Sequence, residues 1–275
     1  RTLADAFSGI RNETIRLNID RKEINNILRI ALMRNDTFLG TYTAWEPNTL
    51  DQLDKVHIGT EGHDETGRFI PYWSRNESGN IGVDPLVDYE NHKTHENGVR
   101  KGDYYLLPKD RDRECAIDPY PYPVQGKIVW ITSLVVPIIA EKQFYGIVGV
   151  DMRLDFIQTM IEQSNKNFYS GAGRMAIVSH NGILAAVSGG SAFVGKHLKE
   201  IETDDWQEDL EQIRFGKSSV SFEEKSIEMI VPLHIDDFLE TNMNDILIDP
   251  CKQATVNQER EVERTAMSYS FTSNT

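Results

Sequence analysis

The sequence predicts an α+β fold in which two modules, each built around an antiparallel sheet, follow one another along the chain. Two patterns carry this prediction: a helical segment followed by the strand-forming segment Phe38–Trp45, and a second group of strands that begins at the Asn181-Gly182 turn. A chain of 275 residues with 39% hydrophobic content is long enough to bury a core in both modules. The expected architecture is therefore two α+β modules in tandem.

An N-terminal helical segment is expected over residues 1–36. Apolar side chains recur at i, i+3, i+4, i+7 and i+8 from Ile24 onward, which places them on one helical face. Asp20, with Glu23 three positions later, is typical of a capping box, which stabilises a helix by about 1 kcal/mol. Turn-forming residues after Met33 end the helix before the first strand.

The first module is expected over residues 37–153. Strand-forming residues alternate in Phe38–Trp45, and aromatic strand character returns at Arg68–Arg75 after a polar, turn-rich connection. The long connection Asn76–Gly102 is expected to carry binding elements, because long ordered loops in compact domains tend to be functional. Three further segments are predicted to be strands: Asp103–Leu107, Ile128–Ala140 and Phe144–Val150.

A connecting helix is expected over residues 154–168, followed by a second, smaller module over residues 169–250. Asn181-Gly182 between two apolar runs is the strongest short-range signal for a β-hairpin. Residues 251–275 have little apolar patterning, so we expect a disordered polar tail there. Limited proteolysis is expected to remove the chain after about Ile235 and to leave a resistant core.

The composition excludes several classes of protein. A net charge of −14 repels phosphate groups, so the chain is not expected to bind nucleic acid or anionic membrane surfaces. Cys115 and Cys251 are far apart, and His57, His63, His92 and His95 lie in polar loops, so neither a metal site nor a cofactor is predicted. No hydrolase, metalloprotease or phosphate-loop motif is present, so no enzymatic activity is predicted. The longest apolar run, Ile128–Ala140, is too short to cross a bilayer.

Six segments of the sequence together resemble double Cache sensor domains. They are Thr41–Asn48 (TYTAWEPN), Gly67–Trp73 (GRFIPYW), Gly102–Pro108 (GDYYLLP), Asp118–Tyr122 (DPYPY), Thr132–Ile138 (TSLVVPI) and Gly146–Asp155 (GIVGVDMRLD). The resemblance covers residues 3–235 and implies the extracytoplasmic (periplasmic or extracellular) sensor of a membrane-anchored methyl-accepting chemotaxis receptor or sensor histidine kinase. It also implies a long N-terminal helix, two PAS-like modules with the ligand in the membrane-distal one, and a homodimer formed through the N-terminal helix.

Aromatic and acidic residues in the first module are the candidates for contacting a small-molecule ligand, because rings stack on planar or cationic groups. Strand alternation places Tyr72 and Trp73 on opposite faces of the sheet, and Asp118 on the same face as Tyr120 and Tyr122. Core packing for the rings, and capping of a turn or a helix for the aspartates, are the structural alternatives. The predicted ligand-binding residues are Trp45, Tyr72, Trp73, Tyr104, Asp118, Tyr120, Tyr122, Thr132 and Asp151.

The predicted ligand is a purine derivative, an amine or an amino acid, with the purine first. Asp118 is expected to neutralise an amine or to accept hydrogen bonds from ring N–H groups. Asp151 is similar to an aspartate that often contacts the ligand in Cache domains. The amino-acid-binding members have an arginine shortly before a Trp-Tyr pair, whereas Pro71 stands there in this chain. Arg68 or Arg75 could substitute for that arginine, but the preferred interpretation of both is a solvated charge at the end of a strand.

Two other functions are compatible with the sequence. One is a periplasmic or secreted hydrolase that uses Asp103 and Asp118 as a pair of carboxylates for acid–base catalysis. The other is an interaction module that binds no small ligand. A sensor would be stabilised by a few related metabolites, whereas an interaction module would respond to none.

Overall fold

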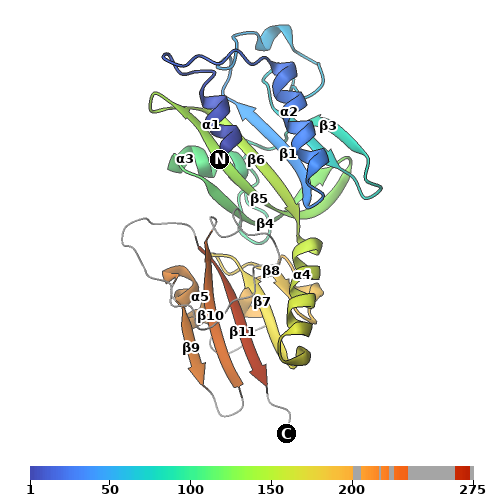
Figure 1. Cartoon of the computed structure of the whole chain (residues 1–275), viewed down its shortest axis with the longest axis vertical. Helices are drawn as coiled ribbons and strands as arrows, with labels where there is room; N and C mark the ends of the chain where they lie inside the picture. The colour runs from blue at the N-terminus through green and yellow to red at the C-terminus, as the bar shows by residue number, and fades with distance from the viewer. Residues whose placement is uncertain (201–205, 217, 223–225, 235–263, 273–275) are drawn as a thin grey trace. The chain divides into compact units, whose positions relative to one another are not determined.

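The computed structural model describes residues 1–200, 206–216, 218–222, 226–234 and 264–272. The chain divides into two compact units, Arg1–Ile157 and Gln158–Thr275, and each contains an antiparallel sheet (Figure 1). The α+β prediction is thereby confirmed. No helix within the described ranges is both long enough and apolar enough to cross a membrane.

The first unit contains a six-stranded sheet with the order β3-β2-β1-β6-β5-β4. Its strands are β1 (Phe38–Trp45), β2 (Pro71–Arg75), β3 (Ile81–Pro85), β4 (Cys115–Val124), β5 (Lys127–Ala140) and β6 (Gln143–Arg153). β1 lies between β2 and β6, so that Tyr42 pairs with Tyr72 on one side and with Gly149 on the other. Because β1 is central, all of its residues after Phe38 are buried.

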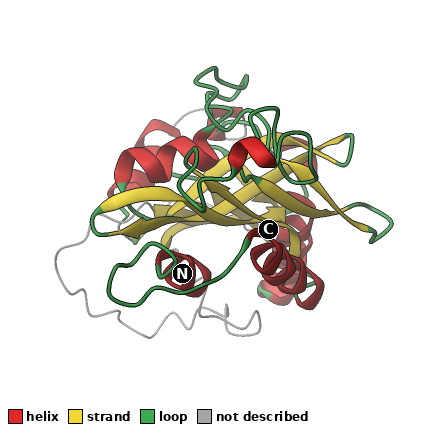
Figure 2. Ribbon diagram, turned by 90° about the horizontal axis from the view of Figure 1, so that it is seen from above, coloured by secondary structure: helices red, strands yellow, loops and turns green. Residues whose placement is uncertain are grey.

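Helices lie on both sides of this sheet (Figure 2). α1 (Thr2–Ser8) and α2 (Arg21–Arg34) pack on one face, where Phe7 and Trp45 belong to one buried cluster. α3 (Asp103–Arg111) packs against β4, β5 and β6 and belongs to a second buried cluster. The sheet therefore separates two apolar layers.

The N-terminal segment forms two helices instead of one long helix. α2 begins with the predicted capping box: Asp20 accepts a hydrogen bond from the Glu23 amide at 2.8 Å, and Glu23 accepts one from the Asp20 amide at 2.9 Å. Between the helices, the Asn12 side chain accepts hydrogen bonds from the amides of Thr14 and Ile15 at 2.9 and 2.7 Å. Such local bonds offer the backbone an alternative to a continuous helix.

The prediction of a strand over Asp103–Leu107 is wrong, because this segment is the start of α3. Its buried residues Tyr104, Tyr105 and Pro108 lie on the face of a helix. A run of five residues is too short to separate a period of two from a period of 3.6. The sheet's missing strand is β4, in the proline-rich segment that follows.

The second unit contains a five-stranded sheet with the order β8-β7-β11-β10-β9. Gly182, at φ +82°, allows the predicted tight turn, and its amide donates to the Ser179 carbonyl at 2.9 Å. The α-helices and strands are α4 (Leu154–Asn167), α5 (Trp206–Phe215), β7 (Gly173–Val178), β8 (Leu184–Val187), β9 (Ser219–Phe222), β10 (Ser226–His234) and β11 (Arg264–Thr272). Short 3-10 helices occur at Asp54–Val56, Tyr169–Gly171, Ser191–Phe193 and Leu198–Glu200.

The prediction of a disordered tail over residues 251–275 is wrong for Arg264–Thr272, which forms β11 between β7 and β10. The pattern Met267-Ser268-Tyr269-Ser270-Phe271 alternates apolar and polar residues, which is the period of a strand. The polar composition around it conceals that pattern. The rest of the tail, and the predicted cleavage point near Ile235, lie outside the described residues.

Candidate ligand-binding site

A buried carboxyl group, that of Asp151, lies on the face of the first sheet that α3 covers. Asp151 is 2% exposed and pairs with Ser133 across β5 and β6. The Ser133 hydroxyl donates a hydrogen bond to Asp151 Oδ1 at 2.6 Å, and the Tyr120 hydroxyl lies 2.8 Å from Ser133 Oγ. A chain of hydroxyl groups therefore holds one oxygen of this carboxyl group.

Two tyrosine hydroxyls face the same carboxyl group from neighbouring strands. The hydroxyls of Tyr42 on β1 and Tyr72 on β2 favour the ionised form of the Asp151 carboxyl group, and both side chains are fully buried. Neither hydroxyl has a partner in hydrogen-bonding geometry among the residues that the structure describes. Because buried polar groups are nearly always hydrogen-bonded, these hydroxyls are suited to a polar group that enters from outside.

Five buried rings surround this carboxyl group, and we call them the tyrosine box: Tyr42, Tyr72, Tyr104, Tyr120 and Tyr122. Tyr104 comes from α3, and its ring centroid lies 5.8 Å from that of Tyr42 and 5.6 Å from that of Tyr122. Tyr72 and Tyr122 meet edge to face at 5.5 Å. Edge-to-face packing places the electron-poor edge of one ring against the electron-rich face of the next.

Two glycines allow the box to form. A Cβ atom on Gly149 would lie 2.2 Å from Cζ of Tyr42, and one on Gly40 would lie 2.4 Å from Cε2 of Tyr72. These rings therefore lie directly over the backbone of β6 and β1. Any larger residue at either position would occupy the volume of a ring.

A covering loop, residues 86–102, closes the box from the side of α3. The Tyr122 hydroxyl accepts a hydrogen bond from the Val87 amide at 3.0 Å, and the Tyr104 hydroxyl donates to the Val87 carbonyl. Asn97 donates from its side chain to the Pro119 carbonyl at 2.7 Å. The loop that the sequence singled out as a place for binding elements therefore contacts the tyrosine box.

The electrostatics of the site are dominated by burial. Removal from water raises the pKa of Asp151 to about 7, although the Ser133 hydrogen bond and the nearby hydroxyls of Tyr72 and Tyr42 oppose the increase. No basic side chain in the described part of the chain acts on this carboxyl group. A ligand that brings a positive charge would therefore meet a carboxylate that has no other counter-ion.

The structure brings five of the predicted ligand-binding residues together: Tyr72, Tyr104, Tyr120, Tyr122 and Asp151. It places the two tryptophans on the opposite face, as alternation predicts for Trp73. Trp45 packs on Phe7 with ring centroids 6.5 Å apart, and Trp73 donates from Nε1 to Asn25 at 2.9 Å. The Thr132 hydroxyl donates to the Ile117 carbonyl at 2.7 Å.

The prediction that Asp118 shares a face with Tyr120 and Tyr122 is wrong. The pairing of β4 with β5 shifts between Ile117 and Tyr120, so that two residues of β4 stand opposite Thr132 alone. Such a bulge reverses the alternation of side chains beyond it. Ile117 before the bulge and Tyr120 and Tyr122 after it are therefore buried on the same face of the sheet. Asp118 is half-buried and does not share that face.

Sequence reasoning missed Tyr42 and Ser133. Tyr42 shares a face of β1 with Gly40, and a glycine inside a strand marks a place where another group approaches the backbone closely, which here is the ring of Tyr72. Ser133 is adjacent to the predicted Thr132 but points to the other face. Its importance depends on being opposite Asp151, which requires the strand order.

The interpretation of Arg68 as a solvated charge is wrong, because its side chain is buried. Its guanidinium donates to the Trp45 carbonyl and to Glu90, and lies 4.7 and 5.0 Å from the ring centroids of Tyr89 and Tyr105. The arginine therefore joins the covering loop and α3 to the end of β1. It is fully engaged in these contacts rather than placed in the tyrosine box.

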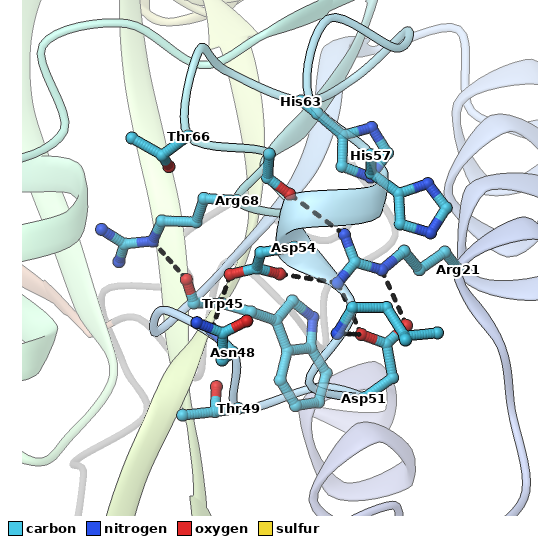
Figure 3. A network of polar contacts seen from close by, with 12 residues as sticks. Arg21, Trp45, Asn48, Thr49, Asp51, Asp54, His57, His63, Thr66 and Arg68 are labelled. Carbon is cyan, nitrogen blue, oxygen red and sulfur yellow. Dashed lines mark hydrogen bonds and ion pairs between the residues drawn. The ribbon is translucent and has the colours of Figure 1, made fainter.

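A second buried arginine anchors α2 to the connection between β1 and β2 (Figure 3). Arg21 donates to Asp51 and Asp54, in both cases from Nη2 at 2.6 Å, and to the Gly67 carbonyl at 3.2 Å. Asp54 also accepts a hydrogen bond from the Asn48 amide at 2.6 Å. This network fixes the connection that leads from β1 to the start of β2.

Replacing Arg21 with glutamine is expected to lower the free energy of unfolding by about 3 kcal/mol, because the change leaves the buried Asp54 carboxylate, and the more exposed Asp51 carboxylate, without their cation. Urea unfolding followed by circular dichroism measures the change. Lys22→Gln is the matched control, since Lys22 is the next residue on α2 and is exposed. An equal effect of the two substitutions would show that the network contributes nothing specific.

Two shallow hollows lie elsewhere on the first unit, with volumes of about 220 and 160 Å³. They share a wall formed by Leu39, Arg75, Asn76, Glu77 and Arg153. No predicted ligand-binding residue lines either hollow. No group of three or more histidine, cysteine or acidic side chains in the described ranges could hold a metal ion.

Comparison with known proteins connects this architecture to sensory receptors. Residues 24–159 match the family described as methyl-accepting chemotaxis protein-like, first PDC sensor domain. The chain is 29% identical over 217 residues to methyl-accepting chemotaxis protein TlpQ of Pseudomonas aeruginosa. That alignment covers 78% of this chain and 30% of the receptor, so the chain spans less than a third of its relative.

Solved structures show the same fold. The extracellular domain of mmHK1S-Z3, a protein assigned as a histidine kinase, has a TM-score of 0.73 at 25% identity, covering 99% of this chain and 84% of that one. The periplasmic sensory domain of the Campylobacter jejuni chemoreceptor Tlp1 has a TM-score of 0.64 at 14% identity, covering 98% and 85%. At 14% identity, the similarity to the Tlp1 domain concerns the fold alone.

Proposed function

Residues 24–159 belong to the methyl-accepting chemotaxis protein-like family of PDC (Cache) sensor domains, and on this premise we propose that the chain senses a small nitrogenous ligand in its tyrosine box. The chain would then be the extracytoplasmic part of a membrane-anchored receptor. An amine, a purine derivative or an amino acid bound through its ammonium group fits the proposal.

The observation that carries the proposal is the buried Asp151 carboxyl group inside an aromatic box. A cationic or N–H-bearing ligand can pair with the carboxylate, satisfy the hydroxyls of Tyr42 and Tyr72, and stack on the surrounding rings. A ligand that offers only carboxylates would be repelled by the same charge. The site therefore favours amines over dicarboxylates.

The hydrolase alternative has no support from the geometry. The Asp103 carboxylate is held by Arg100 at 2.5 Å and accepts from the Arg100 amide at 3.0 Å, next to the start of α3. These bonds give Asp103 a structural role at the end of the covering loop. Asp118 lies on β4, where it does not point toward the tyrosine box.

A ligand screen by thermal unfolding tests the proposal. Primary amines, amino acids, purines and small dicarboxylates are each added to the chain, and a ligand at 100 times its Kd raises the free energy of unfolding by about 2.7 kcal/mol. We expect stabilisation by members of one nitrogenous class. Micromolar binding of a dicarboxylate, with no response to any nitrogenous compound, would contradict the proposal.

Tyr72→Phe is expected to weaken binding of the ligand from that screen about fivefold, because it removes one of the two unpaired hydroxyls. Trp73→Phe is the matched control, since the neighbouring ring lies on the other face against Asn25. Calorimetric titration measures both affinities. A loss of affinity in the Trp73 variant, with none in the Tyr72 variant, would place the ligand on the face of the sheet that α1 and α2 cover.

The receptor is further proposed to form a homodimer through its N-terminal helices. α2 carries Ile30 and Met33 one turn apart, and these side chains are 50% and 55% exposed. A pair of apolar side chains on an outward helical face is suited to packing on a second copy. Sedimentation analysis of Ile30→Glu is expected to show a monomer where the unmodified chain dimerises, and an unchanged mass would contradict this mode of pairing.

A further inference from the structure

The Asp151 carboxyl group is surrounded by neutral hydroxyl groups on every strand that packs around it. Two titratable groups of the covering loop contact the tyrosines instead of the carboxyl group. The His95 ring packs on Tyr120 with centroids 6.0 Å apart, and the Asp88 carboxylate interacts electrostatically with Tyr122. The hydroxyl groups that act on or with the carboxyl group come from Tyr42 of β1, Tyr72 of β2, Tyr120 and Tyr122 of β4 and Ser133 of β5.

A buried carboxylate in such surroundings is unfavourable unless its charge is removed or paired. A proton removes the charge, and a cationic group pairs with it. Both would have to be held by the same carboxyl group, which has one oxygen already engaged by Ser133. The two cannot stabilise the group at the same time.

We propose that a proton and the cationic group of the ligand compete for Asp151, so that the receptor binds its ligand more weakly in acidic surroundings. This inference rests on the proposed function, since it requires a cationic ligand in the tyrosine box. It adds that the empty site holds a proton over much of the acidic range, and that binding of the ligand releases this proton. The same side chain would then respond to both the ligand and the pH.

The size of the effect follows from the neutral midpoint of the carboxyl group. For simple competition, the affinity falls about thirtyfold between about pH 8.5 and about pH 5.5, because the fraction of ionised carboxyl falls by that factor. n-Butylammonium is a suitable probe, since its charge does not change in this range and an alkyl chain can pack on aromatic rings. The affinity is measured by calorimetric titration at both pH values.

A matched variant separates Asp151 from other titrating groups. His95→Gln removes the ring that packs on Tyr120 and is expected to leave the thirtyfold dependence unchanged. Asp151→Asn is expected to eliminate both tight binding and its pH dependence. Equal affinity of the unmodified chain for n-butylammonium at both pH values would overturn the competition while leaving the proposed function intact.

Carbon-13 NMR of the carboxyl groups tests the proton site without any ligand. The Asp151 signal is assigned as the one missing from Asp151→Asn, and we expect its midpoint near neutral pH. A midpoint in the ordinary range for aspartate would overturn the inference. Absence of n-butylammonium binding at both pH values, with no response to any other nitrogenous compound, would instead contradict the proposed function and the competition together.

Discussion

Gly149→Ala is expected to abolish ligand binding and to lower the free energy of unfolding by about 1–3 kcal/mol. The added methyl group would lie 2.2 Å from Cζ of Tyr42 and 2.4 Å from its hydroxyl oxygen. The ring must therefore move away from β6, which forces strain into a packed core. Urea unfolding measures the stability, and calorimetric titration measures the affinity.

Gly82→Ala is the matched control for this substitution. Gly82 lies on β3 of the same sheet, and the atoms nearest to its added methyl group would be those of the Gln125 side chain, at 3.4 Å or more. This variant is expected to retain both stability and affinity. If Gly149→Ala bound ligand as well as Gly82→Ala does, the ring of Tyr42 would not form part of the binding site.

Asp151→Asn is expected to raise the free energy of unfolding by up to about 4 kcal/mol at about pH 8.5, and to change it little below about pH 4. Burial raises the pKa of Asp151 to about 7, so the folded chain holds this proton over a range in which the unfolded chain has lost it. The stability contributed by the protonated carboxyl group is therefore lost as the pH rises from about 4 to about 7. Asparagine carries no charge and avoids this loss.

Asp64→Asn provides a control of opposite sign. Burial opposes ionisation of Asp64, but hydrogen bonds from Thr66 and Tyr89 prevail and lower its pKa. Its substitution is expected to reduce stability in alkaline solution. Urea unfolding at several pH values compares the two variants, and a loss of stability in Asp151→Asn at alkaline pH would show that this carboxylate is compensated in the folded chain.

Local patterns determined several features of this protein correctly. The capping box of Asp20 and Glu23 and the turn at Gly182 depend on residues a few positions apart, and both are present. Strand alternation correctly predicted that Tyr72 and Trp73 lie on opposite faces of the sheet. These features were predictable because neighbouring residues on a helix, turn or strand have fixed relative geometry.

Features that depend on non-local pairing were not predictable in the same way. Asp118 was misplaced because a bulge in β4 changes the alternation, and the bulge becomes apparent only from the pairing with β5. β11 was missed because its partners, β7 and β10, give a polar segment its place in the sheet. The start of α3 is predicted as a strand because its short motif fits either the period of a strand or that of a helix.

The sequence by itself determined the α+β architecture, the aromatic character of the first unit and most of the residues that form the tyrosine box. Only the tertiary structure decided that Tyr42, Ser133 and Asp151 meet, since the strand order β2-β1-β6-β5 brings them together. The tertiary structure also decided the raised pKa of Asp151. Desolvation depends on every ring that excludes water from the carboxyl group, and those rings come from β1, β2, α3 and β4, which no local pattern in the sequence brings into contact.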